Sequence, residues 1–553
     1  MGTNIRIAGE AGQGVQTIGG MLTHALASVG LHVYSTQSYM SRIRGGVNSY
    51  DIRISDRELF SPCEKADLLV ALNAESLEVE RAGSASGGVI VYDGKENVEG
   101  AIVFDMAAAA REAGGTAQMA NSIAAGIVFA MLGLDTDPLC KVLFDMFGKK
   151  KPEAAEKNCV CARKGAELAA NWRGLVKCPR SNTPFGEVIS GSDAVGLSAA
   201  VSGVKVVCSY PMTPSTGVFT QLAALADKYG IVVEQAEDEI AAINVVCGAT
   251  YAGVPSMTTT SGGGFALMAE GLSLAGMLEL PAVVLLSQRP APATGLPTRT
   301  AQQDLHFAVF AGHGEFARAV YAPGTVAQGY DLMRTALEAA HKYQTPALLL
   351  VDQFITDLQQ NISPPGRETR PIDRHIITKP PADYVRYEVT DDGVSPRAIP
   401  GSGAFVVVDS DEHTPDGHIT EDLEVRVIMQ DKRMRKAEGL VDEMLEPEVY
   451  PKPAQEALLC WGSTYGPCRE AVDTLRARGR DVCLIFYPQL WPIDPEKAAT
   501  PLKGRKVTAV EGNFGAQFAT LLKMAGALNS FDVIARYDGL PFTAEYIVRE
   551  VEK

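Results

Sequence analysis

The sequence lacks the close cysteine pairs that bind iron–sulfur clusters or zinc. Its 553 residues include ten cysteines, but none forms a Cys-x-x-Cys pair, and Cys159 and Cys161 are the closest two. Two thiolates with no third ligand nearby rarely hold a cluster. We expect reduced, mostly structural thiols and no metal site in this chain. His413 and His418 share an acidic loop, 409–422, which we interpret as solvated rather than cation-binding.

Long hydrophobic runs and an excess of positive charge are also absent. No apolar run approaches the roughly 18–20 residues of a membrane span, so we expect no span. The chain enters a strand at residue 4, which leaves no room for a signal peptide, and we expect a cytoplasmic location. The formal charge of −16 argues against nucleic acid as a partner, because phosphate repels an acidic surface.

The order of apolar runs predicts an α/β protein with three doubly wound units. We place the units at residues 1–185, 186–370 and 451–553, with an irregular connection over 371–450 that carries a charged helix near its end. The expected strands are 4–8, 68–72 and 88–92, then 204–208, 231–235, 256–259, 282–287 and 347–351, then 457–462, 482–488 and 506–511. Apolar strands bounded by Gly and Pro, with helices between them, indicate mostly parallel sheets covered on both faces.

A glycine-rich turn follows the first strand. Gly9, Gly12 and Gly14 are spaced G-x-x-G-x-G ahead of an amphipathic helix. Glycines let the backbone approach a phosphate, and the helix N-terminus points N–H groups toward it. The dinucleotide spacing G-x-G-x-x-G is missing, which counts against NAD or FAD. A second glycine turn, 41–48 (SRIRGGVN), places arginines beside Gly45 and Gly46.

Four polar stretches each follow a predicted strand of the second unit. They are 210–216 (YPMTPST), 237–239 (EDE), 260–264 (TSGGG) and 289–298 (RPAPATGLPT). Open α/β sheets bind ligands at the carboxyl ends of their strands, so we expect these stretches to share one site.

In this order the four stretches resemble the alpha subunit of the 2-oxoacid:ferredoxin oxidoreductases, and the first unit resembles the gamma subunit of that family, fused in front. The resemblance covers nearly the whole chain. It implies a gamma-type Rossmann-like domain, a thiamine-diphosphate pyrimidine-binding domain and a transketolase C-terminal-like domain. It also implies oxidative decarboxylation of a 2-oxo acid with thiamine diphosphate, iron–sulfur clusters and coenzyme A.

The resemblance assigns the central carboxylate to Glu239, which would hydrogen-bond the aminopyrimidine ring so that the ring can remove the thiazolium proton. An apolar pocket would raise the pKa of that carboxyl. Glu237 is the second candidate. The alternative is a helix N-terminus enriched in acids, which the helix dipole favours. Tyr210 and Pro211 belong to the same implied cofactor site.

The same resemblance implies that Thr213, Arg289 and Thr298 bind the 2-oxo acid, with Arg289 capturing a carboxylate through its planar guanidinium. Ser261 and Gly262 would lie against the cofactor. Structural alternatives remain open: an N-cap at residues 215–216, and an ion pair for the arginine.

Two departures from the family pattern are visible. The usual Thr-Ser-Gly-Pro-Gly turn has Gly263 in place of proline. The usual run QRGGPSTGLPT is QRPAPATGLPT here, with Pro290, Ala291 and Ala293 replacing two glycines and a serine. This loop is therefore stiffer and less polar, which puts any substrate contact by its backbone or serine in doubt.

For the first unit, the resemblance implies that Gly9, Gly12 and Gly14, together with Arg44, Gly45 and Gly46, close over the active site and help hold coenzyme A. A basic hairpin turn without a ligand is the alternative. The C-terminal stretch 510–517 (VEGNFGAQ) matches a family domain with a structural role in subunit contacts, and we assign it no chemistry.

The sequence has no Gly-Asp-Gly, the start of the motif that holds Mg²⁺ and the diphosphate. The resemblance therefore implies a beta subunit that carries the Mg-diphosphate half and at least one [4Fe–4S] cluster, with ferredoxin as acceptor and a dimer of heterodimers as the assembly. This chain would be inactive alone.

Two other functions stay open: thiamine-dependent oxidation of a 2-oxo acid or oxalate without coenzyme A, and a non-catalytic partner chain. The fused arrangement weakly favours 2-oxoglutarate, for which Arg299 is a candidate contact to the distal carboxylate.

Overall fold

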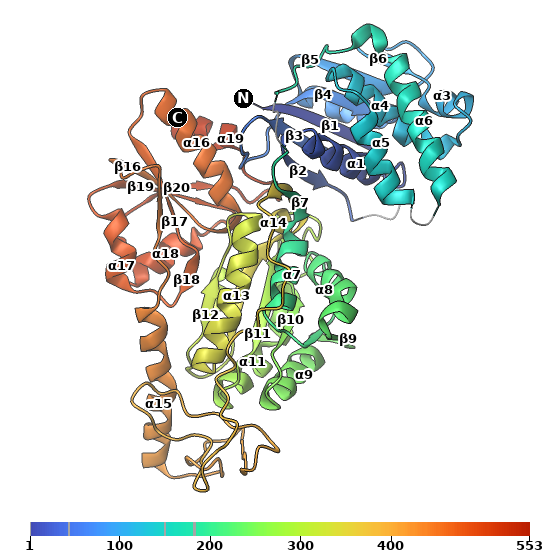
Figure 1. Cartoon of the computed structure of the whole chain (residues 1–553). Helices are drawn as coiled ribbons and strands as arrows, with labels where there is room; N and C mark the ends of the chain where they lie inside the picture. The colour runs from blue at the N-terminus through green and yellow to red at the C-terminus, as the bar shows by residue number, and fades with distance from the viewer. Residues whose placement is uncertain (1, 42–44, 149–150, 181–183) are drawn as a thin grey trace. The chain divides into compact units, whose positions relative to one another are not determined.

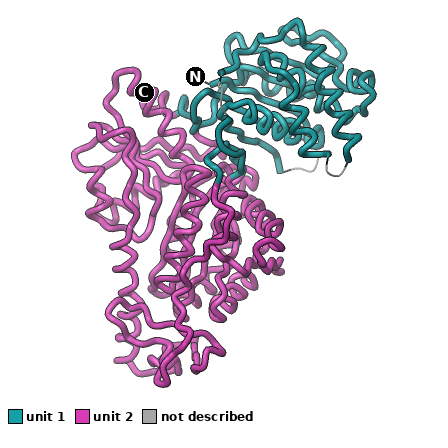
Figure 2. The backbone as a smooth tube through the Cα atoms, viewed as in Figure 1, with its two compact units in different colours: residues 1–190, 357–364, 543–546 teal, residues 191–356, 365–542, 547–553 magenta. Residues whose placement is uncertain are grey.

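The computed structural model describes residues 2–41, 45–148, 151–180 and 184–553, which form two compact units. Unit 1 comprises Met1–Ser190, Asp357–Pro364 and Thr543–Tyr546, and unit 2 comprises Gly191–Thr356, Pro365–Phe542 and Ile547–Lys553 (Figure 2). Residues 357–364 thus belong to unit 1, although they lie inside the predicted range 186–370. The linear domain boundaries stay a prediction.

Unit 1 is built on one eight-stranded sheet of order β6-β5-β4-β1-β3-β2-β14-β7 (Figure 1). Its strands are β1 (Thr3–Glu10), β2 (His32–Ser38), β3 (Val47–Ser55), β4 (Ala66–Ala71), β5 (Ser84–Asp93), β6 (Ile102–Phe104), β7 (Glu187–Ser190) and β14 (Gln359–Ile362). Its helices are α1 (Val15–Ser28), α2 (Ala74–Glu80), α3 (Met106–Glu112), α4 (Ala120–Met131), α5 (Asp137–Leu143) and α6 (Pro152–Leu168).

The three strands predicted for this unit are confirmed as β1, β4 and β5, which run parallel in the sheet. The sequence analysis missed the antiparallel hairpin of β2 and β3 and the return of β14 between β2 and β7. Glycines let α4 and α6 approach closely: a Cβ added at Gly126 would lie 1.9 Å from the backbone oxygen of Ala162.

Unit 2 contains a seven-stranded sheet of order β18-β12-β13-β11-β10-β8-β9 and a five-stranded sheet of order β15-β17-β16-β19-β20. The first is made of β8 (Val206–Ser209), β9 (Val232–Gln235), β10 (Ser256–Thr260), β11 (Val283–Gln288), β12 (Ala319–Tyr321), β13 (Ala347–Asp352) and β18 (Gln489–Trp491). The second is made of β15 (Glu448–Tyr450), β16 (Glu456–Cys460), β17 (Val482–Phe486), β19 (Lys506–Glu511) and β20 (Asp532–Ala535).

The remaining helices connect these strands. They are α7 (Gly191–Val201), α8 (Thr216–Tyr229), α9 (Glu239–Tyr251), α10 (Gly262–Leu267), α11 (Ala269–Met277), α12 (Leu305–Phe310), α13 (Val326–Tyr343), α14 (Gln353–Asp357), α15 (Leu423–Asp442), α16 (Tyr465–Ala477), α17 (Pro495–Ala499), α18 (Gln517–Met524) and α19 (Ala544–Val551). Helix α7 packs between α8 and α13, while α9 packs on α10 and α11.

The eight strands predicted for these two sheets are confirmed, and most of them are largely buried, whereas the edge strand β9 is mostly exposed. Every residue of β11 and β13 is buried, as in a parallel sheet covered on both sides. The sequence did not predict the short strands β12, β15, β18 and β20, of which β15, β18 and β20 are edge strands. Strand β18 pairs with β12, so the C-terminal segment contributes the edge of the first sheet, and one hydrophobic core runs from Leu286 to Trp461 and Ile485.

The connection 371–450 contains the expected charged helix, α15, and is anchored by buried charges. The carboxylate of Glu279 accepts hydrogen bonds at 2.7 and 2.9 Å from Lys432 and is also paired with Lys436, and all three side chains are at most 2% exposed. Burial alone would raise the pKa of Glu279, but the two lysines and Arg386 lower it well below its usual range.

Our interpretation of 409–422 as a solvated loop is wrong for His413. This ring is fully buried and lies 4.0 Å from the Tyr387 ring, while its Nδ1 contacts the Asp411 carbonyl at 3.0 Å. His418 is exposed and pairs with Asp416 at 3.2 Å.

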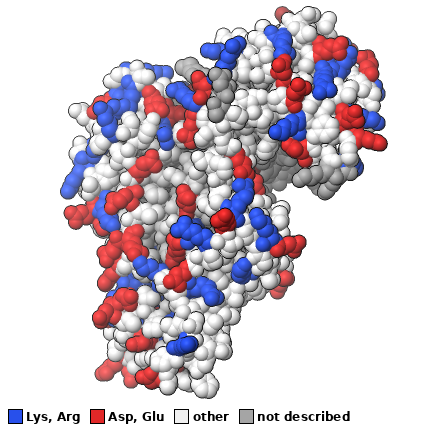
Figure 3. Space-filling model, viewed as in Figure 1, with Lys and Arg blue, Asp and Glu red and all other residues white. Residues whose placement is uncertain are grey.

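Within the described residues, no helix is long and apolar enough to cross a membrane. Figure 3 shows acidic and basic side chains interspersed on the visible face, consistent with a surface that carries both signs of charge.

Candidate active site

The four predicted stretches lie at the carboxyl ends of neighbouring strands in the seven-stranded sheet. In the sheet, β11, β10, β8 and β9 are consecutive and parallel. Because each stretch directly follows one of these strands, the fold brings all four to the carboxyl-terminal end of the sheet, called the site edge below. The sequence predicts a ligand site at this end of the sheet.

Glu239 is the first residue of α9 and is buried, with 3% of its surface exposed. Asp238 caps the helix instead, because its carboxylate accepts a 2.7 Å hydrogen bond from the Ala241 N–H. The Oε1 atom of Glu239 is buried and has no hydrogen-bond partner among the described residues. Glu237, the second candidate, is exposed. Of these acids, therefore, only Glu239 presents an unsatisfied carboxyl oxygen inside the protein.

The glycine turn after β10 lies directly against Glu239. A Cβ added at Gly264 would lie 2.3 Å from Glu239 Oε1 and 2.2 Å from Thr260 Oγ1, so only glycine fits there without displacing the carboxyl. The neighbouring Ser261 is fully buried, and its Oγ has no partner among the described residues. One buried polar atom without a partner, Ser261 Oγ, thus lies on this turn, and a second, Glu239 Oε1, lies against it. Buried polar atoms without partners are costly unless something binds them.

Arg289 reaches across the edge to the stretch after β8. Its Nη1 donates a 2.8 Å hydrogen bond to the carbonyl oxygen of Thr213, and the residue is only 6% exposed. Burial lowers the pKa of Arg289, and the charge of Asp304 opposes that shift. The alternative that Ser215 caps α8 through its side chain does not hold, since its hydroxyl donates to the Met212 carbonyl at 2.7 Å.

Asp304 is a site residue that the sequence analysis missed. It is 8% exposed, and its backbone N–H donates to Gln288 Oε1 at 3.0 Å. Burial raises the pKa of its carboxyl to about 6, against the opposing charge of Arg289. The available signal, an acid directly before an apolar helix, is typical of an N-cap and therefore gave no hint of this position.

The other predicted residues lie at the rim of this edge. Tyr210 is exposed, and Pro211 is half-buried. Thr298 is half-buried at the end of the proline-containing loop, in which Ala293 adopts a positive φ of 54°. Gly262 lies against Asp304 at the start of α10.

The donors and acceptors at this edge fit the pyrimidine half of thiamine diphosphate. The unpartnered Oε1 of Glu239 is a carboxyl oxygen in a low-dielectric setting, the group that an aminopyrimidine nitrogen requires. The Ser261 hydroxyl, on the turn that Glu239 contacts, is a second unpartnered group. Glu239, Ser261 and Gly262 are therefore the residues of this chain that would hold the cofactor.

In unit 1, the glycine turn after β1 borders a separate cavity of about 320 Å³. The lining includes Gly12, Gln13, Asp93 and Asn121. Gly14 is the N-cap of α1 with a φ of 80°, and a Cβ there would lie 2.0 Å from Asn121 Nδ2. A Cβ added at Gly9 would lie 3.0 Å from Gln13 Oε1 and 3.1 Å from Leu72 Cδ1. The turn thus borders a cavity at the carboxyl end of β1.

The basic turn between β2 and β3 is a hairpin connection, as the ladder of these strands requires. Arg44 lies outside the described residues. Gly45 and Gly46 both have a φ of 80°, and a Cβ at Gly46 would lie 2.5 Å from Met40 Sδ.

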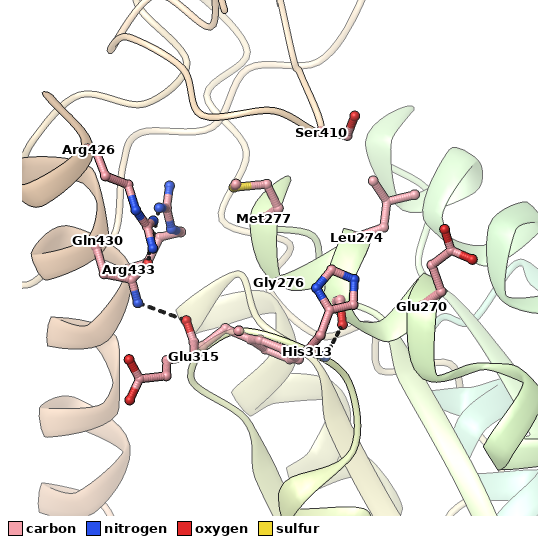
Figure 4. A pocket seen from close by; sticks show the side chains of 13 residues that line it. Glu270, Leu274, Gly276, Met277, His313, Glu315, Ser410, Arg426, Gln430 and Arg433 are labelled. Atoms are coloured by element: carbon pink, nitrogen blue, oxygen red, sulfur yellow. Dashed lines mark hydrogen bonds between the residues drawn. The ribbon is translucent and has the colours of Figure 1, made fainter. Parts of the chain in front are cut away.

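Another cavity, of about 270 Å³, lies between α11, the loop after α12 and α15 (Figure 4). Arg433 lines it, but is engaged with Glu412 through bonds of 3.0 and 2.8 Å, and Gln430 donates to the Glu315 carbonyl at 2.9 Å. Its described lining includes none of the residues predicted from the sequence, so this cavity is distinct from the site.

The fold and the edge of the sheet define a thiamine-diphosphate-type α/β protein, and comparisons agree. Residues 198–432 match the family model "Pyruvate flavodoxin/ferredoxin oxidoreductase, thiamine diP-bdg", and residues 4–168 match "Pyruvate ferredoxin/flavodoxin oxidoreductase". The 2-oxoacid:ferredoxin oxidoreductase subunit alpha of Sulfolobus sp is 31% identical over 97% of this chain and 94% of its own length. The 2-oxoglutarate oxidoreductase subunit KorA of Mycobacterium tuberculosis is 28% identical over 99% of this chain and 90% of its own.

Among solved structures, the 2-oxoglutarate:ferredoxin oxidoreductase from Magnetococcus marinus, with 2-oxoglutarate, coenzyme A and succinyl-CoA bound, aligns with a TM-score of 0.91. It is 32% identical and covers 100% of this chain and 99% of that chain. The chain therefore belongs to the alpha-subunit family of the 2-oxoacid:ferredoxin oxidoreductases. It is an oxidoreductase subunit of a class that uses an iron–sulfur protein as electron acceptor.

Proposed function

We propose that this chain is the fused gamma–alpha subunit of an enzyme that converts a 2-oxo acid and coenzyme A into acyl-CoA and CO2, with transfer of two electrons to ferredoxin. The observation that carries the proposal is the buried, unpartnered Oε1 of Glu239 against the Gly264 turn. The full-length similarity to a 2-oxoglutarate:ferredoxin oxidoreductase supports the same reaction.

In this proposal Glu239 shares a proton with the aminopyrimidine ring through Oε1, and the apolar surroundings strengthen that hydrogen bond. When bound, thiamine diphosphate supplies the electron sink for the carbon left by decarboxylation. Ser261 and Gly262 support the ring from the turn after β10, while Tyr210 and Pro211 border the site after β8.

Arg289 and Thr213 act together on the substrate. The guanidinium is fixed on one side by its bond to the Thr213 carbonyl, so its remaining N–H groups are preorganised for the carboxylate of the 2-oxo acid. The Thr213 hydroxyl faces the keto oxygen of the substrate, and Thr298 contacts the substrate from the end of the loop 289–298.

The favoured substrate is 2-oxoglutarate, with Arg299 as the contact to its distal carboxylate. Support comes from the neighbours that are named for 2-oxoglutarate. Coenzyme A binds in unit 1 at Gly9, Gly12 and Gly14, where Gly12 lines the cavity of about 320 Å³. Arg44, Gly45 and Gly46 help to hold it.

The chain works with partners. A beta subunit carries Mg²⁺, the diphosphate-binding half and a [4Fe–4S] cluster, and two such heterodimers associate. The cysteines of this chain support that division, because all ten are free and eight of them are buried.

The test is viologen reduction by the anaerobically purified complex, with 2-oxoglutarate, pyruvate, phenylglyoxylate and oxalate in turn, each with and without coenzyme A. The Glu239→Gln complex is expected to lose about 100-fold or more of the activity while still assembling. The exposed neighbour Glu237→Gln is the matched control and should retain full activity. Unimpaired turnover in the Glu239→Gln complex would remove the proposal.

The coenzyme A arm separates the alternatives. Viologen reduction that does not require coenzyme A would assign the chain to an enzyme that oxidises a 2-oxo acid or oxalate without coenzyme A. If a complex loaded with thiamine diphosphate and clusters reduces no viologen, the remaining interpretation is a non-catalytic partner chain.

A further inference from the structure

Asp304 occupies the N-cap position of α12 but does not cap the helix. Its side chain accepts no hydrogen bond from the first turn, although an aspartate at this position usually does. The carboxyl is turned away from its own helix, so its orientation calls for a reason other than helix stability.

The carboxyl points to the cofactor turn. A Cβ added at Gly262 would lie 2.5 Å from Asp304 Oδ2 and 2.7 Å from Oδ1, so both oxygens face this glycine. The Oδ2 atom is buried and has no partner among the described residues. Glu239 meets the other end of the same turn at Gly264. Two buried carboxyls, each with one unpartnered oxygen, therefore flank the glycines at 262–264.

Asp304 lies beside the segment that carries Arg289, because its N–H donates to Gln288 Oε1 at 3.0 Å and the neighbouring Gln303 Nε2 donates to the Arg289 carbonyl at 3.2 Å. The charge of Arg289 lowers the pKa of the Asp304 carboxyl against the effect of burial. Each of these groups influences the other, since the charge of Asp304 also opposes the effect of burial on Arg289. When Asp304 is ionised, its charge offsets part of the electrostatic attraction of the Arg289 guanidinium for an anion. When Asp304 is protonated, the whole of that attraction is available to an anion that binds. At low dielectric such a difference is large.

We propose that Asp304 is a positioning residue that sets how much of the Arg289 charge is available to the carboxylate of the substrate. The inference rests on the proposed function, in which Arg289 binds a 2-oxo acid. A protonated Asp304 favours binding of the acid, and an ionised Asp304 weakens it by repulsion and by competition for the guanidinium.

The titratable groups at this end of the sheet come from four elements. Arg289 follows β11, Glu239 begins α9, and Asp352 pairs in register with Gln288 at the end of β13. On its own helix, His306 is turned to the Gln517 carbonyl, with Nε2 at 2.8 Å. Burial places the pKa of Asp304 at about 6, within the range that an assay can scan.

The test is the Michaelis constant of the complex for its 2-oxo acid between about pH 5.5 and pH 7.5, a range in which a 2-oxo acid stays ionised. In the unaltered complex the constant should rise with pH by up to roughly tenfold, the factor that one pKa unit represents. In the Asp304→Asn complex it should be low and nearly independent of pH. Glu234→Gln, which removes an exposed carboxylate on β9, should keep the unaltered profile.

Parallel profiles in the unaltered and Asp304→Asn complexes, or a flat profile in the unaltered complex, would overturn the role of Asp304. If the asparagine variant does not assemble, Asp304→Ser removes the same charge and carries the same expectation. Failure of the proposed function is distinguishable, because the unaltered complex would then oxidise no 2-oxo acid at any pH. An effect confined to kcat, with an unchanged profile of the Michaelis constant, also contradicts the proposal.

Discussion

Gln302 and Gly512 hold each other through two hydrogen bonds of 2.8 Å. The backbone N–H of Gln302 donates to the Gly512 carbonyl, and the backbone N–H of Gly512 donates to Gln302 Oε1. Gln302 Nε2 also donates to the Trp461 carbonyl at 2.7 Å. The loop that carries Arg289 and Asp304 is thereby tied to the C-terminal sheet, which gives the stretch 510–517 a role in fixing the site edge.

Replacing Gln302 by alanine should loosen this loop. The substitution leaves the buried Gly512 N–H without its partner, whereas the Trp461 carbonyl keeps a 2.7 Å hydrogen bond from Thr464 Oγ1. The expected loss is about 1–3 kcal/mol of unfolding free energy. Thermal or denaturant unfolding of the chain measures it. Gln455→Ala, at an exposed glutamine of the same C-terminal region, should change stability by less than about 0.5 kcal/mol. Equal stability of the two variants would show that the tie is unimportant.

Alanine at Gly264 and at Gly263 should have opposite consequences. At Gly264 the new methyl group would lie 2.3 Å from Glu239 Oε1, whereas nothing lies within 4 Å of a Cβ at Gly263. We expect Gly264→Ala to abolish most 2-oxo acid oxidation by the complex and to lower the melting temperature of the chain. Gly263→Ala should be neutral or slightly stabilising, since alanine is the better helix former by about 1 kcal/mol. Similar behaviour of the two variants would contradict the position assigned to Glu239.

Removing the charge of Glu279 should be strongly destabilising. Glu279→Gln leaves the buried Lys432 and Lys436 without their counter-charge, and breaking such a cluster costs about 3–5 kcal/mol. Chemical denaturation reads out the loss. The control is Glu338→Gln, which removes the 2.8 Å pair with Arg334 on the surface of α13 and should cost about 0.5 kcal/mol or less.

The buried Asp352 should make stability depend on pH. Burial raises the pKa of its carboxyl to about 6, despite hydrogen bonds from Ser463 and Ile355 that oppose the shift. The folded state therefore binds its proton more tightly than the unfolded state. The resulting stability is present below about pH 4 and is lost as pH rises through about 6.

Asp352→Asn removes this titration. The melting temperature of the variant, relative to the unaltered chain, should therefore increase between about pH 5 and pH 7. A constant difference across that range would show that Asp352 does not titrate there. The exposed Asp227→Asn serves as the control and should give a constant difference.

Much of the fold was predictable because the strands are apolar runs with sharp ends. Strand β11 and strand β13 are buried along their whole length, so their sequences carry few polar residues. The short strands β12 and β18 were not predicted, because each has only three residues, and their pairing joins segments far apart in the chain.

The sequence by itself determined which stretches end strands of the second sheet, and hence that Thr213, Glu239 and Arg289 lie at one edge, because strand ends depend on local residues. Only the tertiary structure decided that Glu239 is buried while Glu237 is exposed, and that Asp304 turns to Gly262 rather than capping its helix. Burial and electrostatic environment depend on side chains that are distant in sequence, and no local pattern encodes them.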